Sequence, residues 1–472
     1  MKLLFVIPGT GDFHCGSCLR DAALMRGLGA VGHEVTAVPM YLPWVLEEDA
    51  GHEPRARTPL FFGGINTYLD ASAAWARRLP AWLRRGLDAT PLLRLAARLS
   101  HLTSAGDLGR LSVSMIADAH TAHRREIDRL AHWIDRQGPP DVICLSNSML
   151  IGIGAALADR CGAKLVCSLQ GEDAFVDALV DPYRQQTWQA IGERAPRVAR
   201  FIAPSRFYAR RMAEQLGCPP RQIATVYNGT TIATDGDPPR PAPPPGPLRL
   251  GYLARMHPSK GLDRLVDTWA TLQRRPAWAR GQLVIAGAVA AGDRRYVRRL
   301  QRRLDRAGLG ETARWHANVT RQQKLDLLRG LGLLCVPTTL DEAFGLYLLE
   351  AWACGLPVVV PRRGALPELC DITGGGWLYD PDDPAALAAT LEAAAGDPAE
   401  LHRRGQAGRN AVARRFTAAH MAEAFADVLG RLDDASPDSQ PDSQPDSLLD
   451  SLHDSRGASP QNSPHDSPKG DG

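Results

Sequence analysis

The chain has 472 residues, of which 44% are hydrophobic and 23% are charged. This length exceeds what one hydrophobic core supports, so we expect two domains with appendages. The formal net charge of +3 is too small to indicate nucleic-acid binding by itself. No apolar stretch approaches the roughly 20 residues that span a bilayer, and no cleavage pattern follows the short apolar start. We therefore expect a cytoplasmic protein.

The first half of the chain alternates between strand-like and helix-like segments. Residues 2–7 predict a buried strand, followed by a glycine-rich turn, an amphipathic helix over 19–28 and a second strand from Val35. Further strands are expected at 142–145, 164–169, 200–203 and 223–227. Such alternation indicates a parallel sheet covered by helices. We assign residues 1–230 to one doubly wound α/β domain.

A proline-rich stretch marks the clearest domain boundary. Proline does not continue a helix or a central strand, so residues 231–247 are interpreted as a linker. Strand-like segments recur at 248–253, 282–286, 333–336 and 358–360. We assign residues 248–415 to a second α/β domain and 416–432 to a last helix. Residues 433–472 contain a Pro-Asp-Ser-Gln repeat and predict a disordered tail.

The chain has nine cysteines, an odd number that fits reduced thiols better than a disulfide framework. Cys15 and Cys18 form a C-x-x-C pair at a predicted strand-to-helix turn, where a helix N-terminus lowers a thiol pKa. No second pair at suitable spacing completes a zinc site. A redox or metal role stays open, and small residues that close a tight turn are the favoured interpretation.

The stretch from Asp341 to Glu350 is the strongest clue to function. It follows an apolar run and reads Asp-Glu-Ala-Phe-Gly-Leu-Tyr-Leu-Leu-Glu. The order of a strand, a polar loop and then a helix that begins near a glycine is typical of anion sites. The start of such a helix offers backbone N–H groups and the positive end of its dipole to an anion. Glu342 then lies in the loop, and Glu350 lies one to two turns into the helix. Two surface carboxylates on an ordinary helix are the alternative.

This spacing resembles the E-x7-E motif of the retaining family 4 glycosyltransferases. That family has the GT-B fold, in which two Rossmann-like doubly wound α/β domains face each other across a cleft and a last helix crosses back to the first domain. Its members move a sugar from a nucleotide-sugar donor to an acceptor. The resemblance extends from about Met1 to Leu432. It implies that Glu350 binds the ribose of the donor and that Glu342 contacts the transferred sugar.

The resemblance also implies a diphosphate site. Arg255 and Lys260 follow the first strand of the second domain, at the place where the family binds the donor diphosphate. Charge-assisted contacts to a departing phosphate strengthen as its negative charge grows, and they act in place of a metal. The N–H groups of Phe344, Gly345 and Leu346 are expected to bind the same phosphates. We expect no cofactor besides the nucleotide-diphosphate sugar, which is the donor substrate.

Two further segments complete the predicted donor site. Gly9 and Gly11 follow the first strand, but their pattern is a weak dinucleotide fingerprint because His14 occupies the third glycine position. They fit better as a loop that approaches the donor sugar and phosphate. In the second domain, Ala317 to Val319 resembles the segment that passes the nucleobase in the family.

The segment Asp380-Pro-Asp382 superficially matches the Asp-x-Asp signature of metal-dependent transferases. It precedes a helix that is expected to start near Ala385. Aspartate is common at helix N-caps. Helix capping is therefore the favoured interpretation, and no catalytic metal is predicted.

One position departs from the family pattern. Many relatives carry a histidine near the end of a first-domain strand that contacts the sugar or the acceptor hydroxyl, and Gln170 stands in that place here. Glutamine takes no proton at neutral pH, so Gln170 is expected to orient a substrate by hydrogen bonding. Glu172 or Asp173 becomes the candidate for contacting the acceptor. A retaining transfer in which the departing phosphate oxygen takes the acceptor proton needs no side-chain base.

The segment from Trp75 to Arg85 combines aromatic and cationic side chains. One interpretation is a helix that lies on an anionic membrane surface where a lipid-linked acceptor is held. The favoured interpretation is a basic surface helix over the acceptor site.

The sequence therefore predicts a retaining glycosyltransferase that moves a hexose-type sugar to a glycan, a lipid-linked acceptor or a small molecule. Two alternatives keep the fold: a sugar-phosphate synthase or phosphorylase-like enzyme, and a non-catalytic partner subunit that binds a nucleotide sugar. No nucleic-acid partner is expected.

Overall fold

The computed structural model describes residues 1–8, 16–41, 61–63, 105–117, 123–232 and 248–433. Residues Met1–Gly430 form one compact unit, and Arg431–Gly472 form a second. The described part of the second unit is short, so the fold below is that of the first unit. It contains two parallel β-sheets that follow one another along the chain.

The first sheet has seven strands in the order β3-β2-β1-β4-β5-β6-β7. Every neighbouring pair in it is parallel. Its strands are β1 (Lys2–Ile7), β2 (Glu34–Tyr41), β3 (Phe61–Gly63), β4 (Val142–Leu145), β5 (Lys164–Ser168), β6 (Arg200–Ala203) and β7 (Ile223–Thr225). Strands β1 and β4 are buried along nearly their whole length. This burial explains why their sequences are runs of apolar residues without alternation.

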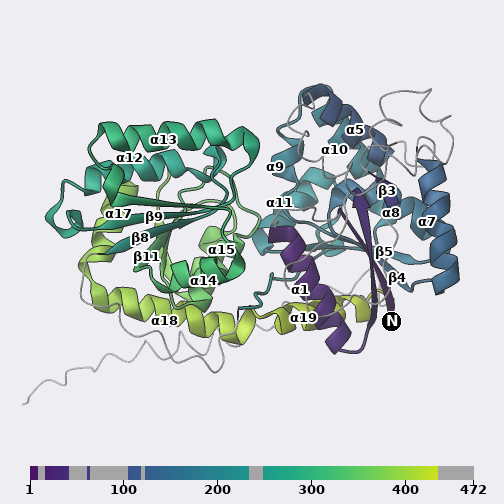
Figure 1. The fold of residues 1–472 in the computed structure, drawn as a ribbon. Helices are drawn as coiled ribbons and strands as arrows, with labels where there is room; N and C mark the ends of the chain where they lie inside the picture. The colour runs from purple at the N-terminus through teal and green to yellow at the C-terminus, as the bar shows by residue number, and fades with distance from the viewer. Residues whose placement is uncertain (9–15, 42–60, 64–104, 118–122, 233–247, 434–472) are drawn as a thin grey trace, which may run out of the picture. The chain divides into compact units, whose positions relative to one another are not determined.

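Helices cover both faces of the first sheet. They are α1 (Gly16–Ala30), α5 (Ala105–Ala117), α7 (Arg124–Gln137), α8 (Ile151–Cys161), α9 (Asp173–Val176), α10 (Tyr183–Arg194) and α11 (Arg206–Leu216). Helices α5, α8 and α10 pack against one another, and α7 packs on α8. Figure 1 shows α1 on the other side of the sheet, beside α19 (Ala418–Gly430).

The second sheet has six strands in the order β10-β9-β8-β11-β12-β13, and it is also parallel throughout. Its strands are β8 (Arg249–Leu253), β9 (Gln282–Gly287), β10 (Ala313–Ala317), β11 (Leu333–Cys335), β12 (Val358–Pro361) and β13 (Gly376–Tyr379). Its helices are α12 (Leu262–Leu272), α13 (Arg294–Arg306), α14 (Arg321–Arg329), α15 (Leu346–Ala353), α16 (Leu366–Thr373), α17 (Ala386–Gly396) and α18 (Pro398–Arg415). Helices α12 and α13 cover one face, and α18 runs along the opposite face (Figure 1).

The last helix, α19, packs on the first sheet although the chain reaches it from the second. The rings of Phe5 in β1 and Phe425 in α19 are 6.2 Å apart. Just before α19, the backbone of Thr230 donates to the carbonyl of Phe416 at 2.8 Å and accepts from Ala418 N–H at 3.0 Å. These bonds join the end of the segment after β7 to the start of α19.

The predicted strands agree with the structure to within a few residues at each end. The short strands β3 and β13, which lie at sheet edges, were not predicted. Four groups of sequence predictions lie outside the described residues. They concern Gly9, Gly11 and Cys15, the segment Trp75–Arg85, most of the proline-rich linker, and nearly all of the tail. In the part of the chain that the structure describes, no helix is long and apolar enough to cross a membrane.

Candidate active site

The carboxyl ends of the second sheet converge on one edge, because all its strands are parallel. Strand β8 lies between β9 and β11, so the chain leaves β8 toward one side of the sheet and later returns to the other side. Ligands of doubly wound sheets bind at such a reversal of strand order. Lys260 follows β8 and Glu342 follows β11, and both therefore lie at this point.

Lys260 and Glu342 form an ion pair across that reversal. The Nζ atom of Lys260 donates to Oε1 of Glu342 at 2.6 Å, although the residues are 82 positions apart in sequence. Their side chains are only 22% and 11% exposed, respectively. Partial removal from water strengthens a charge-assisted hydrogen bond. The structure thus brings together the residue predicted to bind the diphosphate and the residue predicted to contact the sugar.

The loops that carry this ion pair are bound to each other through their backbones. The carbonyl of Ser259 accepts from the N–H of Thr339 at 3.0 Å and from the hydroxyl of Thr338 at 3.1 Å. Gly261 has φ +68°, and a Cβ there would come within 1.8 Å of the carbonyl oxygen of Pro337. A side chain at this position would separate the two loops, so the glycine after Lys260 is required by their close approach.

Gly364 is a supporting residue that sequence reasoning missed. Its φ is +58°, and a Cβ would lie 2.4 Å from the backbone nitrogen of Glu342. The N–H of Ala365 donates to the carbonyl of Glu342 at 2.9 Å. The loop after β12 therefore fixes the backbone that carries Glu342. A glycine soon after a strand is too common a signal to have identified it.

Arg255 is held by Asp293, another residue that sequence reasoning missed. The Nε atom of Arg255 donates to Oδ2 of Asp293 at 2.9 Å. The aspartate is buried, whereas the arginine side chain is 54% exposed. The described residues offer no hydrogen-bond partner to the two terminal nitrogens of Arg255. Its guanidinium is thus anchored at one nitrogen and open to a ligand at the others.

His257 lies between the two predicted phosphate-binding side chains. Its Nδ1 accepts from the N–H of Ser259 at 3.2 Å and so caps the short helical turn Pro258–Lys260. Burial lowers the pKa of His257 from its ordinary value of 6.5. The carboxylate of Asp293 opposes this shift, whereas Arg255 and Lys260 add to it. The cap therefore uses the neutral ring, since a protonated Nδ1 cannot accept.

This cap predicts a pH dependence of stability. Because the pKa of His257 is lower in the folded than in the unfolded state, the unfolded state binds more protons just below pH 6.5. The contribution of His257 to stability is then complete above pH 6.5 and is lost as the pH falls toward the folded pKa. We expect urea denaturation to show a larger loss of stability between pH 7 and pH 5 for the native protein than for His257→Asn, whose amide retains the cap. Identical pH profiles would contradict this role.

Glu350 also pairs with a lysine. The Nζ atom of Lys324 in α14 donates to Oε1 of Glu350 in α15 at 2.5 Å, and both side chains are about one fifth exposed, at 19% and 22%. Helix α15 begins directly after Gly345, which has φ +96°. Phe344 is buried and contacts the rings of Tyr227 and Phe416. Its side chain thus packs inside the protein, and binding of a phosphate by its N–H stays a prediction.

The segment Ala317–Val319, predicted to pass the nucleobase, lies at the same sheet edge. Asn318 has φ +54°, its N–H donates to the carbonyl of Gly287 at 2.9 Å, and its Oδ1 accepts from Val289 N–H at 2.9 Å. Thr320 then caps α14 in a capping box. The segment therefore leads directly into the helix that places Lys324 against Glu350.

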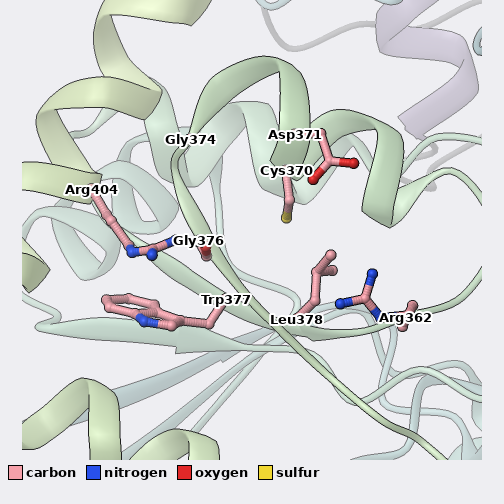
Figure 2. Close-up of a pocket in the computed structure, with 8 residues that line it drawn as sticks. All are labelled: Arg362, Cys370, Asp371, Gly374, Gly376, Trp377, Leu378 and Arg404. Carbon is pink, nitrogen blue, oxygen red and sulfur yellow. Dashed lines mark hydrogen bonds between the residues drawn. The ribbon is translucent and has the colours of Figure 1, made fainter. Parts of the chain in front are cut away.

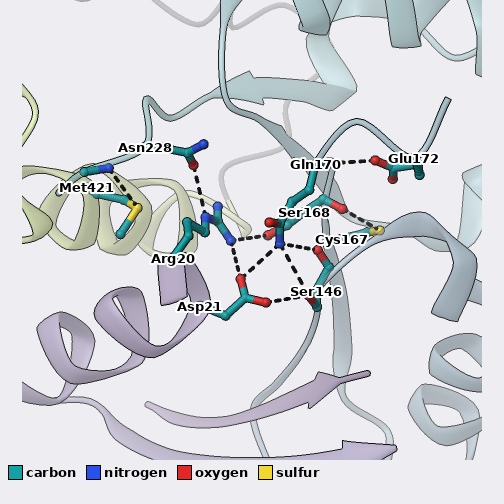
Figure 3. Close-up of polar contacts among 10 residues, drawn as sticks. Arg20, Asp21, Ser146, Cys167, Ser168, Gln170, Glu172, Asn228 and Met421 are labelled. Carbon is teal, nitrogen blue, oxygen red and sulfur yellow. Dashed lines mark hydrogen bonds and ion pairs between the residues drawn. The ribbon is translucent and has the colours of Figure 1, made fainter. Parts of the chain in front are cut away.

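Gln170 lies at the carboxyl end of β5 in the first sheet, with its amide turned inward (Figure 3). Its Nε2 donates to Oδ1 of Asp21 at 3.0 Å and to the carbonyl of Ser146 at 2.7 Å. A carboxylate and a carbonyl only accept, so the nitrogen of the amide must face them. The Oε1 atom has no hydrogen bond to the described residues. Gln170 is thus left with an acceptor to offer a substrate.

Asp21 and Arg20 form a buried ion pair beneath Gln170, and neither was identified from the sequence. They are 1% and 3% exposed, and Nη1 of Arg20 lies 2.8 Å from Oδ1 of Asp21. The hydroxyl of Ser146 donates to Oδ2 of Asp21 at 2.5 Å, and Nε of Arg20 donates to Asn228 at 3.1 Å. Burial raises the pKa of Asp21, and the Arg20 charge opposes that shift.

Glu172 and Asp173, predicted to contact an acceptor, have partners inside the protein. Glu172 accepts from Ser148 N–H at 2.9 Å and from Gln170 N–H at 2.6 Å. Asp173 accepts from the hydroxyl of Tyr208 at 2.8 Å and pairs with a nearby arginine. Both carboxylates are buried. In this structure they shape the loop after β5, and their contact with an acceptor stays a prediction.

Glu368 in α16 binds the start of α11, which belongs to the first sheet. Its two oxygens accept from the N–H groups of residues 206–207 at 3.0 and 2.9 Å, and Oε1 also accepts from the hydroxyl of Tyr227 at 2.7 Å. Beside it, the hydroxyl of Ser205 donates to the carbonyl of Ala343 at 2.7 Å. The loop that carries Glu342 is therefore bound to the N-terminus of α11.

A separate pocket of about 380 Å³ lies against β13, α16 and α18 (Figure 2). It is lined by Arg362, Cys370, Asp371, Gly374, Gly376, Trp377, Leu378 and Arg404. Arg404 lies over the indole of Trp377, 4.5 Å from the ring centroid, and also binds Glu400 and the carbonyl of Gly376. This arginine joins α18 to the edge strand, and none of the predicted site residues lies in the pocket.

In the described part of the chain, no group of three or more His, Cys, Asp or Glu side chains is placed to hold a metal ion. Asp380 accepts from the N–H of Asp382 at 2.9 Å, and Asp382 lies 3.4 Å from Arg363. Near the start of α17, the N–H of Ala385 donates to Asp383, so neither Asp380 nor Asp382 caps this helix as predicted. Cys18 is buried in α1.

Comparison with known families gives a consistent match along the chain. Residues 109–234 match the family described as Glycosyltransferase Family 4, and residues 235–411 match the one described as Glycosyl transferases group 1. The chain belongs to glycosyltransferase family 4. The two matched regions meet after β7: the first contains strands β4 to β7 of the first sheet, and the second contains every strand of the second sheet.

Curated relatives of this chain are D-inositol 3-phosphate glycosyltransferases. The protein from Catenulispora acidiphila is 30% identical over 294 residues, which cover 59% of this chain and 62% of the relative. The one from Xylanimonas cellulosilytica is 28% identical over 405 residues, covering 79% of this chain and 93% of the relative. The first match thus spans less than two thirds of that relative.

Solved structures show the same fold. Anabaena HepE, crystallised with UDP and glucose, has a TM-score of 0.65 and 17% identity, and the match covers 90% of this chain and 99% of HepE. The sucrose-phosphate synthase from Thermosynechococcus elongatus has a TM-score of 0.66 and 18% identity, with coverage of 92% and 100%. The predicted GT-B fold is confirmed.

Proposed function

We propose that this family 4 protein is a retaining glycosyltransferase that moves a hexose-type sugar from a nucleoside-diphosphate sugar to an acceptor hydroxyl. The ion pair between Lys260 and Glu342 is the observation that carries the proposal. It joins a diphosphate-binding charge and a sugar-binding carboxylate at the strand-order reversal of the second sheet. The loops after β8 and β11, which carry Lys260 and Glu342, are also joined by a backbone hydrogen bond from Thr339 to Ser259. An ordinary pair of surface side chains would need no such bond.

The donor is proposed to lie along the carboxyl edge of the second sheet. Lys260 and Arg255 bind its diphosphate, with the N–H groups of residues 344–346 at the start of α15. Glu350 binds the ribose, and Ala317 to Val319 passes the base. In the structure, Lys260 donates to Glu342. A bound diphosphate competes for that lysine and leaves Glu342 free to accept from the hydroxyls of the donor sugar.

The transfer proposed here retains the configuration of the sugar. The bond between the anomeric carbon and the phosphate oxygen breaks, and the acceptor oxygen bonds to the same carbon from the same face. The acceptor proton passes to the departing phosphate oxygen, so no side-chain base and no metal is needed. Arg255 and Lys260 stabilise the charge that grows on the diphosphate. Gln170 accepts a hydrogen bond through Oε1, which fits a substrate hydroxyl that donates.

The acceptor is proposed to bind on the side of residues 1–230, and residues 248–415 hold the donor. Residues 231–247 link these domains, and the last helix returns to the first. The relatives' name gives an inositol phosphate as their acceptor, so D-inositol 3-phosphate is one acceptor to test beside glycans and lipid-linked sugars. The proposed setting is the cytoplasm, at the membrane when the acceptor is lipid-linked.

We expect a nucleotide to raise the melting temperature of the protein without added metal, because a ligand that binds the folded state stabilises it by mass action. The panel comprises UDP, GDP, ADP and their sugars, each at about 100 times the dissociation constant once that is known, where the stabilisation is about 2.7 kcal/mol. UDP-glucose comes first, since Anabaena HepE was also crystallised with it. Replacing Glu350 by Ala is expected to remove most of the shift.

The control for this panel is Glu392→Ala, which changes a half-buried carboxylate of α17 that is paired with Arg275. The control variant should keep the full shift. No shift with any nucleotide would refute the donor site. A shift without product formation, or a requirement for a sugar phosphate in turnover, would instead support the partner-subunit or the synthase alternative.

A further inference from the structure

Helix α13 carries an exposed face made of arginines. The helix reads Arg-Arg-Tyr-Val-Arg-Arg-Leu-Gln-Arg-Arg-Leu-Asp-Arg. Tyr296, Leu300 and Leu304 are buried against the second sheet. Seven of the eight exposed positions of the helix, 294, 295, 298, 299, 302, 303 and 306, are arginine, and the eighth is Asp305. At 3.6 residues per turn they spread over about half of the helix circumference, along roughly 20 Å. We call these seven side chains the arginine face.

Most of these charges have no partner among the residues that the structure describes. Arg303 pairs with Asp267 of α12 at 2.7 Å, and Arg299 lies over the ring of Tyr296, 5.5 Å from its centroid. Among the described residues, no side chain forms a hydrogen bond or an ion pair with the other five arginines. The acidic residue of the helix, Asp305, faces Gly310.

The arrangement is unfavourable for an isolated helix. Arginines four residues apart repel each other, and each such like-charge pair destabilises the helix. Arg294 and Arg295 also occupy the first turn, where the helix dipole disfavours positive charge. Contact with an anionic partner would offset both the repulsion between the arginines and their unfavourable interaction with the helix dipole. The arginine face is therefore built for contact with dense negative charge.

We propose that the arginine face of α13 docks onto an anionic phospholipid surface. A convex half-cylinder of guanidinium groups contacts phosphates that lie in one plane, and long arginine side chains reach that plane from the flanks. Recognition of nucleic-acid bases would call for aromatic or amide side chains among the arginines, and the exposed positions carry none. This surface is distinct from the segment Trp75–Arg85 and does not depend on the proposed transfer reaction.

The test is sedimentation of the whole protein with vesicles. Phosphatidylcholine vesicles containing phosphatidylglycerol are compared with pure phosphatidylcholine vesicles. Each arginine near such a surface contributes roughly fivefold in affinity. The triple variant Arg298→Gln, Arg302→Gln, Arg306→Gln is therefore expected to bind the anionic vesicles about 100-fold more weakly than the native protein. Raising the salt to about 1 M should remove the binding of the native protein.

The matched control removes three exposed arginines from α7 by Arg124→Gln, Arg125→Gln and Arg136→Gln. It should bind within about threefold of the native protein, because the net charge changes equally while the arginine face is intact. Circular dichroism checks that both variants fold.

Three outcomes overturn the proposal. The native protein fails to bind anionic vesicles, both triple variants lose affinity equally, or a DNA oligonucleotide binds more tightly than the vesicles and depends on the same three arginines. The last result would assign the arginine face to nucleic acid.

Discussion

Replacing Lys260 by Met is expected to lower the turnover number by about 100- to 1,000-fold, which is the usual effect of removing one preorganised donor to a developing oxyanion. The side chain keeps its length and loses the charge that stabilises the departing diphosphate. It also leaves Glu342, only 11% exposed, without its partner at 2.6 Å. Initial rates with the donor found by thermal shift measure the effect, with the turnover number and KM determined separately.

Lys324→Met is the matched control, because Lys324 pairs with Glu350 at 2.5 Å in the same way. That pair is assigned to the ribose, which does not react, so its loss should mainly raise KM. The two variants thus separate transition-state stabilisation from uniform binding. Native turnover in Lys260→Met would contradict the assignment. An equal loss of turnover in both variants would show that both pairs support the fold instead.

Replacing Asp21 by Ala is expected to destabilise the protein by about 3–5 kcal/mol, because it leaves the buried guanidinium of Arg20 without its carboxylate. Urea denaturation followed by fluorescence measures the change. Ser146→Ala is the control, since it removes one neutral donor to Asp21 and should cost about 1 kcal/mol. The double variant Arg20→Met, Asp21→Ala should be more stable than Asp21→Ala, because no unpaired charge is then buried.

A loss below about 1 kcal/mol in Asp21→Ala would show that the ion pair is not needed for folding. The same variant has a second readout if it folds. Without Asp21, the amide nitrogen of Gln170 keeps the Ser146 carbonyl, at 2.7 Å, as its closest acceptor. The amide is then held less firmly than by both residues, so its orientation toward a substrate becomes less fixed. We then expect KM for the acceptor to rise.

The parts of the site that are local in sequence were predictable. Strands β1, β8 and β12 are mostly apolar runs; Pro8 follows β1, and β12 ends at Pro361. Glu342 and Glu350 have the family spacing within one loop and helix. Their placement beside Lys260 and Lys324 follows from the parallel sheet, which brings all carboxyl strand ends to one edge.

The supporting contacts were not predictable, because they join residues far apart in the chain. Asp293 binds Arg255 across 38 positions, and Asp21 binds Gln170 across 149. In the sequence, Asp21 looks like the polar side of an amphipathic helix. Glu172 was predicted to contact the acceptor, and nothing in the sequence indicated that it is buried and accepts hydrogen bonds from Ser148 and Gln170.

Glu368 has a consequence for catalysis although it lies outside the proposed donor site. If the two sheets separated at α11, two backbone N–H groups and the Tyr227 hydroxyl would lose their acceptors, at a cost of about 1–3 kcal/mol for each group that stays buried. The bond from Ser205 to the Ala343 carbonyl would break in the same step. Separation of the two sheets would therefore also release the backbone beside Glu342. Under the proposed function, we expect the release of product to coincide with the loss of this support for Glu342.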